Sequence, residues 1–149
     1  MRADDHAALR LWLRLLTCTL LIEQDIKTKL RERFAMTLAR FDLMAQLERH
    51  PAGLKMSELS RRLMVSGGNV TGLTDQLVAE GLVERHAVPA DRRAFQVRLT
   101  TVGRKAFLGM AREHERWIAE LTRGLSAADR DRLYGLLGKL KRSLAVKED

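Results

Sequence analysis

Side chains that suit a polyanion are concentrated between residues 54 and 100 of this 149-residue chain. Arginine binds phosphate oxygens, asparagine and glutamine can pair with the edge of adenine, and glycine lets a phosphate approach the backbone closely. We predict nucleic-acid contacts from Arg61, Arg62, Ser66, Gly67, Gly68, Asn69, Thr71, Thr74, Gln76, Asp91, Arg92 and Arg93. Because an Arg-Arg pair in a turn is also compatible with plain solvation, the surrounding elements must decide between these interpretations.

Two helices in succession are predicted to carry the first nine of these residues. A short amphipathic helix is expected over residues 56–64, because Leu59 and Leu63 lie one turn apart with arginines on the other side. Ser66 is a good N-cap for the second helix, and Gly81 is a good terminator for it. The buried stripe of the second helix is expected to be Val70, Leu73, Leu77 and Val78. Base reading is predicted for four polar residues on its other faces, Asn69, Thr71, Thr74 and Gln76.

A two-stranded hairpin is predicted directly after the second helix. Residues 82–88 and 94–99 have strand composition, and the connection over residues 89–93 holds a proline and an aspartate, which favour a turn. The order helix, turn, helix, hairpin predicts a winged helix-turn-helix, mostly α with a small β-hairpin wing. In that fold the second helix enters the major groove of DNA, and the hairpin reaches the flanking backbone or the minor groove.

The bulk composition favours the same interpretation. Lysine and arginine number 27 against 19 for aspartate and glutamate, so the net charge is +8 and the isoelectric point is near 10.4, which favours a polyanionic partner. The single cysteine excludes a disulfide framework and predicts a reducing, cytoplasmic location. Because no apolar run approaches the ~20 residues of a membrane span, no membrane partner is expected.

Leucine-rich helices are predicted on both sides of the winged domain. The first is apolar almost all round, which indicates burial on more than one side. Its leucines include Leu9, Leu13, Leu16 and Leu20, and those of the last helix are Leu133, Leu137, Leu140 and Leu144. In a chain this small, a second subunit is the expected cover. We predict a homodimer in which residues 1–30 and 104–149 form a helical dimerisation region, while residues 31–103 form the winged helix-turn-helix DNA-binding domain.

These residues resemble the MarR family of bacterial transcription regulators. The matching segments are SELSRRLMVS, LVAEGLVER, DRRAFQVRLT and the following Gly103-Arg104. The resemblance implies a homodimeric regulator, which we interpret as a repressor, on a near-palindromic operator in double-stranded DNA. It also implies that Asp91 pairs with Arg93 and holds this arginine toward the minor groove. The chain departs from the family at Lys55, where a Ser or Thr N-cap is usual, and at Gly72, where a basic or polar side chain is common.

The resemblance further implies a small effector that relieves DNA binding, in a cleft between the helical region and the winged domain. Apolar walls with one convergent cation suit an organic acid, above all an aromatic one, or an acyl thioester. The residues predicted to supply this cleft are Trp12, Leu16, Phe34, Leu38, Arg40, Phe41 and Met44. The alternative interpretation of the phenylalanines and the methionine is ordinary core packing.

Other kinds of site find little support in the sequence. The histidines show no ligand spacing and there is no C-x-x-C motif, so neither a metal nor another cofactor is expected. Because no nucleophile–base arrangement is found, the chain is not predicted to be an enzyme. Two alternatives remain: a winged helix that binds protein instead of DNA, and redox sensing through Cys18, which otherwise is a core cysteine. His114 lies in the apolar stripe of its helix and is either a packed histidine or a ligand contact.

Overall fold

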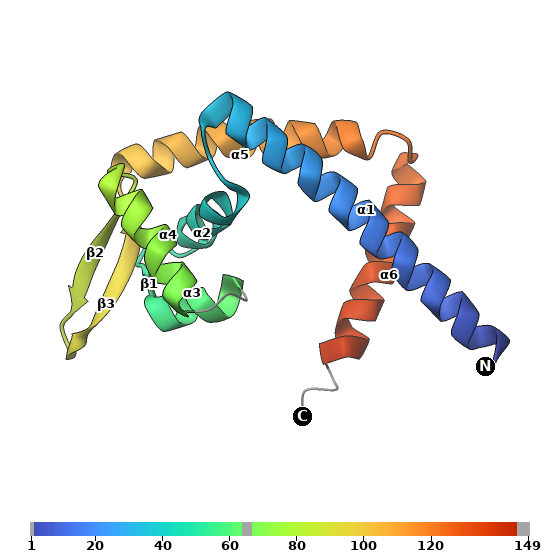
Figure 1. Ribbon diagram of the computed structural model, residues 1–149, viewed down its shortest axis with the longest axis horizontal. Coiled ribbons are helices and arrows are strands. Elements are labelled where there is room, and N and C mark those ends of the chain that lie inside the picture. The colour runs from blue at the N-terminus through green and yellow to red at the C-terminus, as the bar shows by residue number, and fades with distance from the viewer. Residues whose placement is uncertain (1, 64–66, 146–149) are drawn as a thin grey trace. The chain divides into compact units, whose positions relative to one another are not determined.

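The computed structural model describes residues 2–63 and 67–145 (Figure 1). The elements in chain order are α1 (Ala3–Phe34), α2 (Leu38–Arg49), β1 (Leu54–Lys55), α3 (Met56–Leu63), α4 (Gly67–Ala79), β2 (Val83–Val88), β3 (Asp91–Leu99), α5 (Thr101–Leu121) and α6 (Ala127–Ala145). The predicted fold class, mostly helical with a small sheet, is confirmed. The helix-turn-helix pair is α3 and α4, and the hairpin β2–β3 follows it as the wing.

The described structure separates into two compact units, Met1–His114 and Glu115–Asp149. The first unit holds α1 to β3 and the larger part of α5, and the second holds the end of α5 together with α6. Neither unit coincides with the division expected from the sequence, in which residues 104–149 join residues 1–30. That functional division remains a prediction.

The sheet has three antiparallel strands in the order β1–β3–β2. The short strand β1, which the sequence did not predict, pairs Leu54 with Val97. The hairpin is tighter than expected: β3 begins at Asp91, and the turn is only Pro89 and Ala90. This difference arises because the register shifts after Ala87, which takes up the additional residues of β3.

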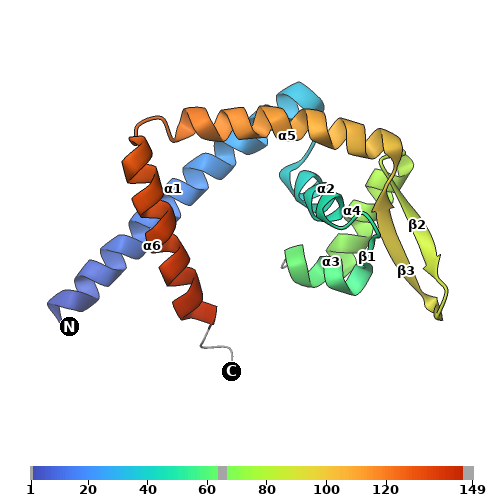
Figure 2. The same cartoon turned by 180° about the vertical axis from the view of Figure 1, so that it is seen from behind.

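The core of the first unit is built around α2, which packs against α3, α4 and β3 (Figure 2). Three of its apolar residues, Leu43, Met44 and Leu47, are almost completely buried. Phe41 stacks against α5, with ring centroids 5.3 Å from Phe107 and 5.1 Å from the half-buried His114. Burial lowers the pKa of His114 below its ordinary value.

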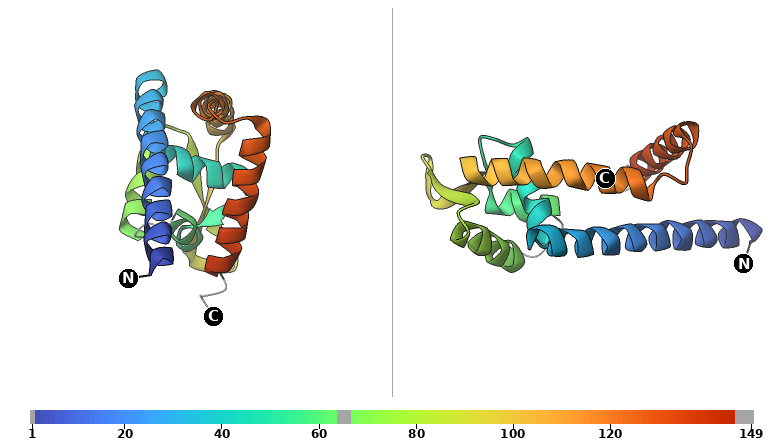
Figure 3. Two further views of the ribbon diagram at one scale, coloured as in Figure 1. Left: turned by 90° about the vertical axis from the view of Figure 1, so that its right-hand side faces the viewer. Right: turned by 90° about the horizontal axis from the view of Figure 1, so that it is seen from above.

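The outer helices expose most of their leucines. All residues of α1 from Ala3 to Arg14 are exposed, and this half of the helix extends beyond the winged-helix elements (Figure 3). In the second unit, α6 has no buried residue, and Ser126 caps it by accepting a hydrogen bond from the Asp129 amide at 3.1 Å. This hydrogen bond satisfies one of the amides that the start of a helix leaves free. None of the described helices combines the length and apolar character needed to cross a membrane.

Candidate nucleic-acid interface

The carboxyl end of α4 is closed by a glycine cap. Gly81 has a φ of +73°, its amide donates to the carbonyl of Val78 at 3.0 Å, and the amide of Leu82 donates to the carbonyl of Leu77 at 2.9 Å. These two hydrogen bonds form a Schellman motif, which satisfies carbonyls that a helix end otherwise leaves free. The predicted termination at Gly81 is confirmed, and it fixes where the chain leaves α4 for the wing.

Thr100 joins this cap to the start of α5. Its hydroxyl donates to the carbonyl of Gly81 at 2.7 Å and accepts from the amide of Gly103 at 2.9 Å, while its own amide donates to the carbonyl of Leu82 at 3.1 Å. Thr100 therefore acts as the N-cap of α5 and as a clamp on the α4–β2 turn. The Leu-Thr-x-x-Gly-Arg segment is thus a structural joint beneath the candidate interface.

The exposed face of α4 carries three of the four predicted base-reading residues. Asn69, Thr71 and Gln76 are exposed. Asn69 and Gln76 lie seven residues apart, so they share a face of the helix. Gly72 lies between them, and a side chain at this position would meet no atom within 4 Å. At Gly72, where the family commonly has a basic or polar side chain, this face of α4 therefore has open space.

Thr74 does not belong to that face. Its side chain is completely buried, and its hydroxyl donates to the carbonyl of Val70 at 2.8 Å and approaches the sulfur of Met56 on α3 at 3.8 Å. The prediction that Thr74 reads a base is wrong in this structure, because its position four residues after Val70 places it on the core stripe of the helix. The prediction followed from its polar side chain, which suits a base contact.

The arginines of α3 lie where a phosphate contact needs them, on the surface. Arg61 and Arg62 are exposed in the last turn of α3, opposite the buried Leu59. At the other end of the helix, the amide of Lys55 donates to the carboxylate of Glu58 at 3.4 Å. Glu58 thereby supplies one half of a capping box, which partly replaces the hydroxyl cap that Lys55 lacks.

Part of the predicted interface lies outside the described residues. This applies to Ser66 and to the side chains of Arg92 and Arg93, so the expected pair between Asp91 and Arg93 stays a prediction. Asp91 is exposed, and the backbones of Gly67 and Gly68 lie in the first turn of α4.

An ion pair that was not predicted from the sequence joins the wing to α4. Arg85 of β2 donates to the carboxylate of Asp75, which lies on the exposed side of α4. This pair ties the middle of the helix to the first wing strand. Opposite charges at positions 75 and 85 were a signal, but only the fold shows that the two residues meet.

The seven residues predicted to line an effector cleft are divided between different environments. Phe41 and Met44 are core residues with exposed fractions of 4% and 0%, so they correspond to the alternative interpretation. Phe34 lines a mainly apolar cavity of about 660 Å³ together with Met36, Glu80, Leu82, Val102, Lys105, Ala106, Gly109 and Met110. Leu38 lines another cavity, of about 500 Å³, next to Lys27 and Arg31.

The remaining three lie in neither of these cavities. Trp12 is 53% exposed and Leu16 is half-buried, both on α1. Arg40 is buried and its guanidinium donates to the carboxylate of Glu80. The expected organic-acid cation is therefore engaged with a carboxylate of the chain itself.

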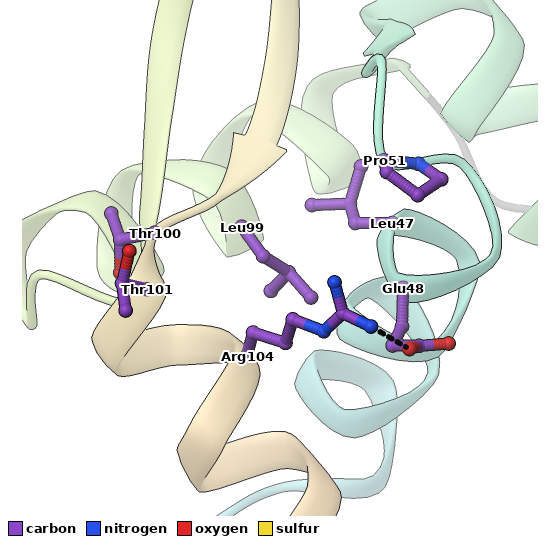
Figure 4. A pocket seen from close by; sticks show the side chains of 7 residues that line it. All are labelled: Leu47, Glu48, Pro51, Leu99, Thr100, Thr101 and Arg104. Atoms are coloured by element: carbon purple, nitrogen blue, oxygen red, sulfur yellow. Dashed lines mark ion pairs between the residues drawn. The ribbon is translucent and has the colours of Figure 1, made fainter.

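A further hollow of about 340 Å³ lies behind the wing, between α2, the end of β3 and the start of α5 (Figure 4). Arg104 reaches across it to Glu48 at 3.5 Å, close to Leu47 and Leu99. The ion pair bridges α2 and α5, so this hollow is part of the joint that supports the wing. Among the described residues, no group of three or more His, Cys, Asp or Glu side chains could hold a metal ion.

The arrangement of two short helices and a wing agrees with known proteins. A model of the MarR family matches residues 36–94, the winged part of the chain. A MarR family transcriptional regulator of known structure from Silicibacter pomeroyi is 35% identical, with a TM-score of 0.82 over 97% of this chain and 99% of that one. The chain belongs to the MarR family. It is a DNA-binding transcriptional regulator of the MarR type, as its sequence predicts, and this family is not one of enzymes.

Two further proteins that are similar to this chain have been described as a DNA complex and as a repressor. A structure of a MarR mutant from E. coli complexed with operator DNA is 25% identical, with a TM-score of 0.79 over 94% of this chain and 99% of that one. The transcriptional repressor YetL of Bacillus subtilis is 30% identical over 96 residues, which are 64% of this chain and 58% of YetL.

Proposed function

We propose that this chain is a homodimeric repressor that binds a near-palindromic operator. In this proposal α4 enters the major groove, where Asn69, Thr71 and Gln76 contact base edges, while Arg61 and Arg62 bind phosphates without regard to sequence. The wing, with Asp91, Arg92 and Arg93, contacts the flanking backbone or minor groove. The similarity to the repressor YetL supports repression over activation.

The observation that carries the proposal is the exposed polar face of α4, which a rigid joint holds in place. A reading helix must present side chains to bases without moving, because each base contact depends on its direction. The cap at Gly81, the clamp of Thr100 and the pair of Asp75 with Arg85 all act on this one helix. The relative in complex with operator DNA supports the same mode of binding.

Exposed leucines support the homodimer. Apolar side chains in such number on outer helices mark an interface rather than a free surface. On α1 they are Leu9, Leu11, Trp12, Leu13, Leu20 and Leu21, and on α6 they are Leu133, Tyr134, Leu136, Leu137, Leu140 and Leu144. We infer that a second copy covers these faces. Two-fold symmetry then places two α4 helices about one turn of DNA apart, roughly 34–36 Å.

DNA selected from genomic fragments by the purified protein, followed by a binding titration at several salt concentrations, tests the proposal. We expect a near-palindromic consensus, and an affinity that falls steeply with salt because phosphate contacts release counterions. Sedimentation at micromolar concentration should show a dimer, and Leu137→Lys should give a monomer that binds more weakly, whereas Leu137→Met should behave as wild type. A stable wild-type monomer, or binding insensitive to salt, would argue for a protein-binding winged helix instead.

We further propose that a small organic anion or acyl thioester relieves repression. Of the residues expected at such a site, Phe34 lines the mainly apolar cavity of about 660 Å³, and Lys105 provides a cation in the same lining. Relief of binding requires that the effector prefers the conformation that is not bound to DNA. A 100-fold change in operator affinity corresponds to about 2.7 kcal/mol of differential binding.

A further inference from the structure

Arg40 is the one buried charged side chain in the described core of the first unit. It lies in the first turn of α2, where its amide donates to the hydroxyl of Thr37 at 3.2 Å. Its side chain is only 8% exposed, whereas that of Glu80, its partner, is 48% exposed. A buried arginine is costly unless it is paired, so the carboxylate of Glu80 is a requirement of this position.

Glu80 is the one carboxylate that pairs with Arg40 in the described part of the chain. One terminal nitrogen of the guanidinium donates to Glu80, while Nε has no hydrogen-bond partner in the described part of the chain. An apolar side chain of similar volume would fill the same space without either penalty, and such replacements are often neutral or stabilising. We therefore expect the pair to contribute to the direction of α4 more than to the free energy of folding.

Glu80 lies at the carboxyl end of α4, a helix whose buried stripe packs on α2 and α3. It directly follows the last residue of α4, and its amide still donates to the carbonyl of Gln76 at 3.1 Å. The next residue is Gly81, which holds the cap and the clamp of Thr100. Arg40 therefore adds an ion pair from α2 to this end of α4, where the cap and Thr100 already connect the helix with the wing and α5.

Small rotations at this joint are amplified at the other end of the helix. A 13-residue helix such as α4 is about 20 Å long. A rotation of about 10° at its carboxyl end thus moves its first turn, where Gly67, Gly68 and Asn69 lie, by about 3 Å over this length. Such a shift exceeds the tolerance of a hydrogen bond to a base or a phosphate.

We propose that Arg40 is a positioning residue for DNA binding, which through Glu80 fixes the direction of α4. This inference rests on the proposed function, since it assumes that α4 enters a DNA groove. It assigns Arg40 a task inside the protein, in place of the contact with an organic acid that the sequence predicts.

The test compares operator affinity with stability in one set of variants. Arg40→Met and Glu80→Gln each break the pair, and we expect each to weaken operator binding about tenfold, within the range for residues that act through packing. The double variant Arg40→Met with Glu80→Leu replaces the ion pair by an apolar contact. We expect it to regain the thermal stability of wild type while operator affinity stays about tenfold weaker.

Arg33→Met is the matched control. It removes the same charge from an ion pair with Glu113, at 3.2 Å, that joins α1 and α5. Its operator affinity should stay within about twofold of wild type. In the Arg40 variant, the slope of log K against log salt concentration should equal that of wild type. Loss of a phosphate contact would reduce this slope by about one, so an unchanged slope shows that Arg40 does not bind phosphate.

Each other outcome overturns the inference. If the double variant binds the operator as tightly as wild type, the pair is merely structural. If the Arg40 variant has a reduced salt slope, Arg40 is a phosphate contact. If the single variants stay folded and bind as wild type, the direction of α4 does not depend on the pair. If wild type itself forms no salt-sensitive complex with DNA, the proposed function fails together with this inference.

Discussion

Gly103 lies directly against the carbonyl of Leu82. A methyl group at position 103 would come within 1.8 Å of that oxygen and 2.7 Å of its carbon. The first turn of α5 is therefore pressed onto the backbone between α4 and the wing, at a distance that only glycine allows.

Gly103→Ala should destabilise the protein, since the added carbon meets backbone that cannot rotate away. We expect a loss of about 2–3 kcal/mol in the free energy of unfolding, as for other cases of overpacking. Gly109→Ala in the same helix is the control, because a side chain there would meet nothing within 4 Å. It should leave stability unchanged or raise it by up to about 1 kcal/mol, as alanine favours helices. Urea unfolding measures both, and equal stability of the two variants would contradict the tight joint.

Base reading should depend on the exposed face of α4 and not on its buried stripe. Gln76→Ala should relax the preference at one or two operator positions, at a cost of about 1–3 kcal/mol for the preferred base. Thr74→Val should leave base preference unchanged and lower stability by about 1 kcal/mol, because the hydroxyl loses its hydrogen bond to Val70 and its weaker contact with the sulfur of Met56. Binding to a set of single-base operator variants separates these results. A uniform loss on all sequences from Gln76→Ala would assign this residue to the DNA backbone.

The wing should contribute to operator binding through Arg93 and Asp91. Arg93→Ala should weaken operator binding without lowering thermal stability, because a minor-groove arginine contributes only in the complex. Asp91→Ala should weaken binding as well, since the resemblance to the family assigns it the task of holding this arginine. His86→Ala, on the neighbouring strand, is a suitable control for the hairpin itself. If both wing variants bind the selected operator like wild type, the wing makes no essential contact.

Sequence patterns predicted the local structure better than they predicted contacts between residues that are far apart in the chain. The helix-turn-helix and the cap at Gly81 follow from leucine spacing and from a glycine in the right place, both of which are local signals. Thr74 looked like a base reader because its chemistry suits one, whereas its burial depends on the packing of α4 on α3. Arg40 likewise looked like a ligand contact. Its partner Glu80 is forty residues away, and no local pattern can disclose such a pair.

The stability of the first unit should fall in mild acid because of His114. Burial lowers its pKa in the folded protein below the value in the unfolded chain, so the unfolded chain takes up the proton first. The contribution is fully present above the unfolded pKa of about 6.5 and is lost as the pH falls from there toward the folded pKa. His114→Phe should reduce this loss between pH 7.5 and pH 5.5, as measured by urea unfolding. His6→Gln, at an exposed position, should retain the wild-type dependence; equal curves for all three proteins would exclude His114 as the source.

Effector binding should be sensitive to the cavity beside Phe34. An organic acid needs apolar walls and one cation, and this cavity offers Met36 and Ala106 as walls with Lys105 at its edge. Ala106→Leu should fill part of the space, so we expect operator binding near that of wild type together with a reduced response to effector. A titration of aromatic acids and their acyl thioesters against the protein–operator complex is the measurement. Relief of binding in wild type that Ala106→Leu diminishes would support the site. Equal relief in both proteins would place the effector elsewhere, and an operator affinity that none of these compounds alters would indicate a constitutive repressor.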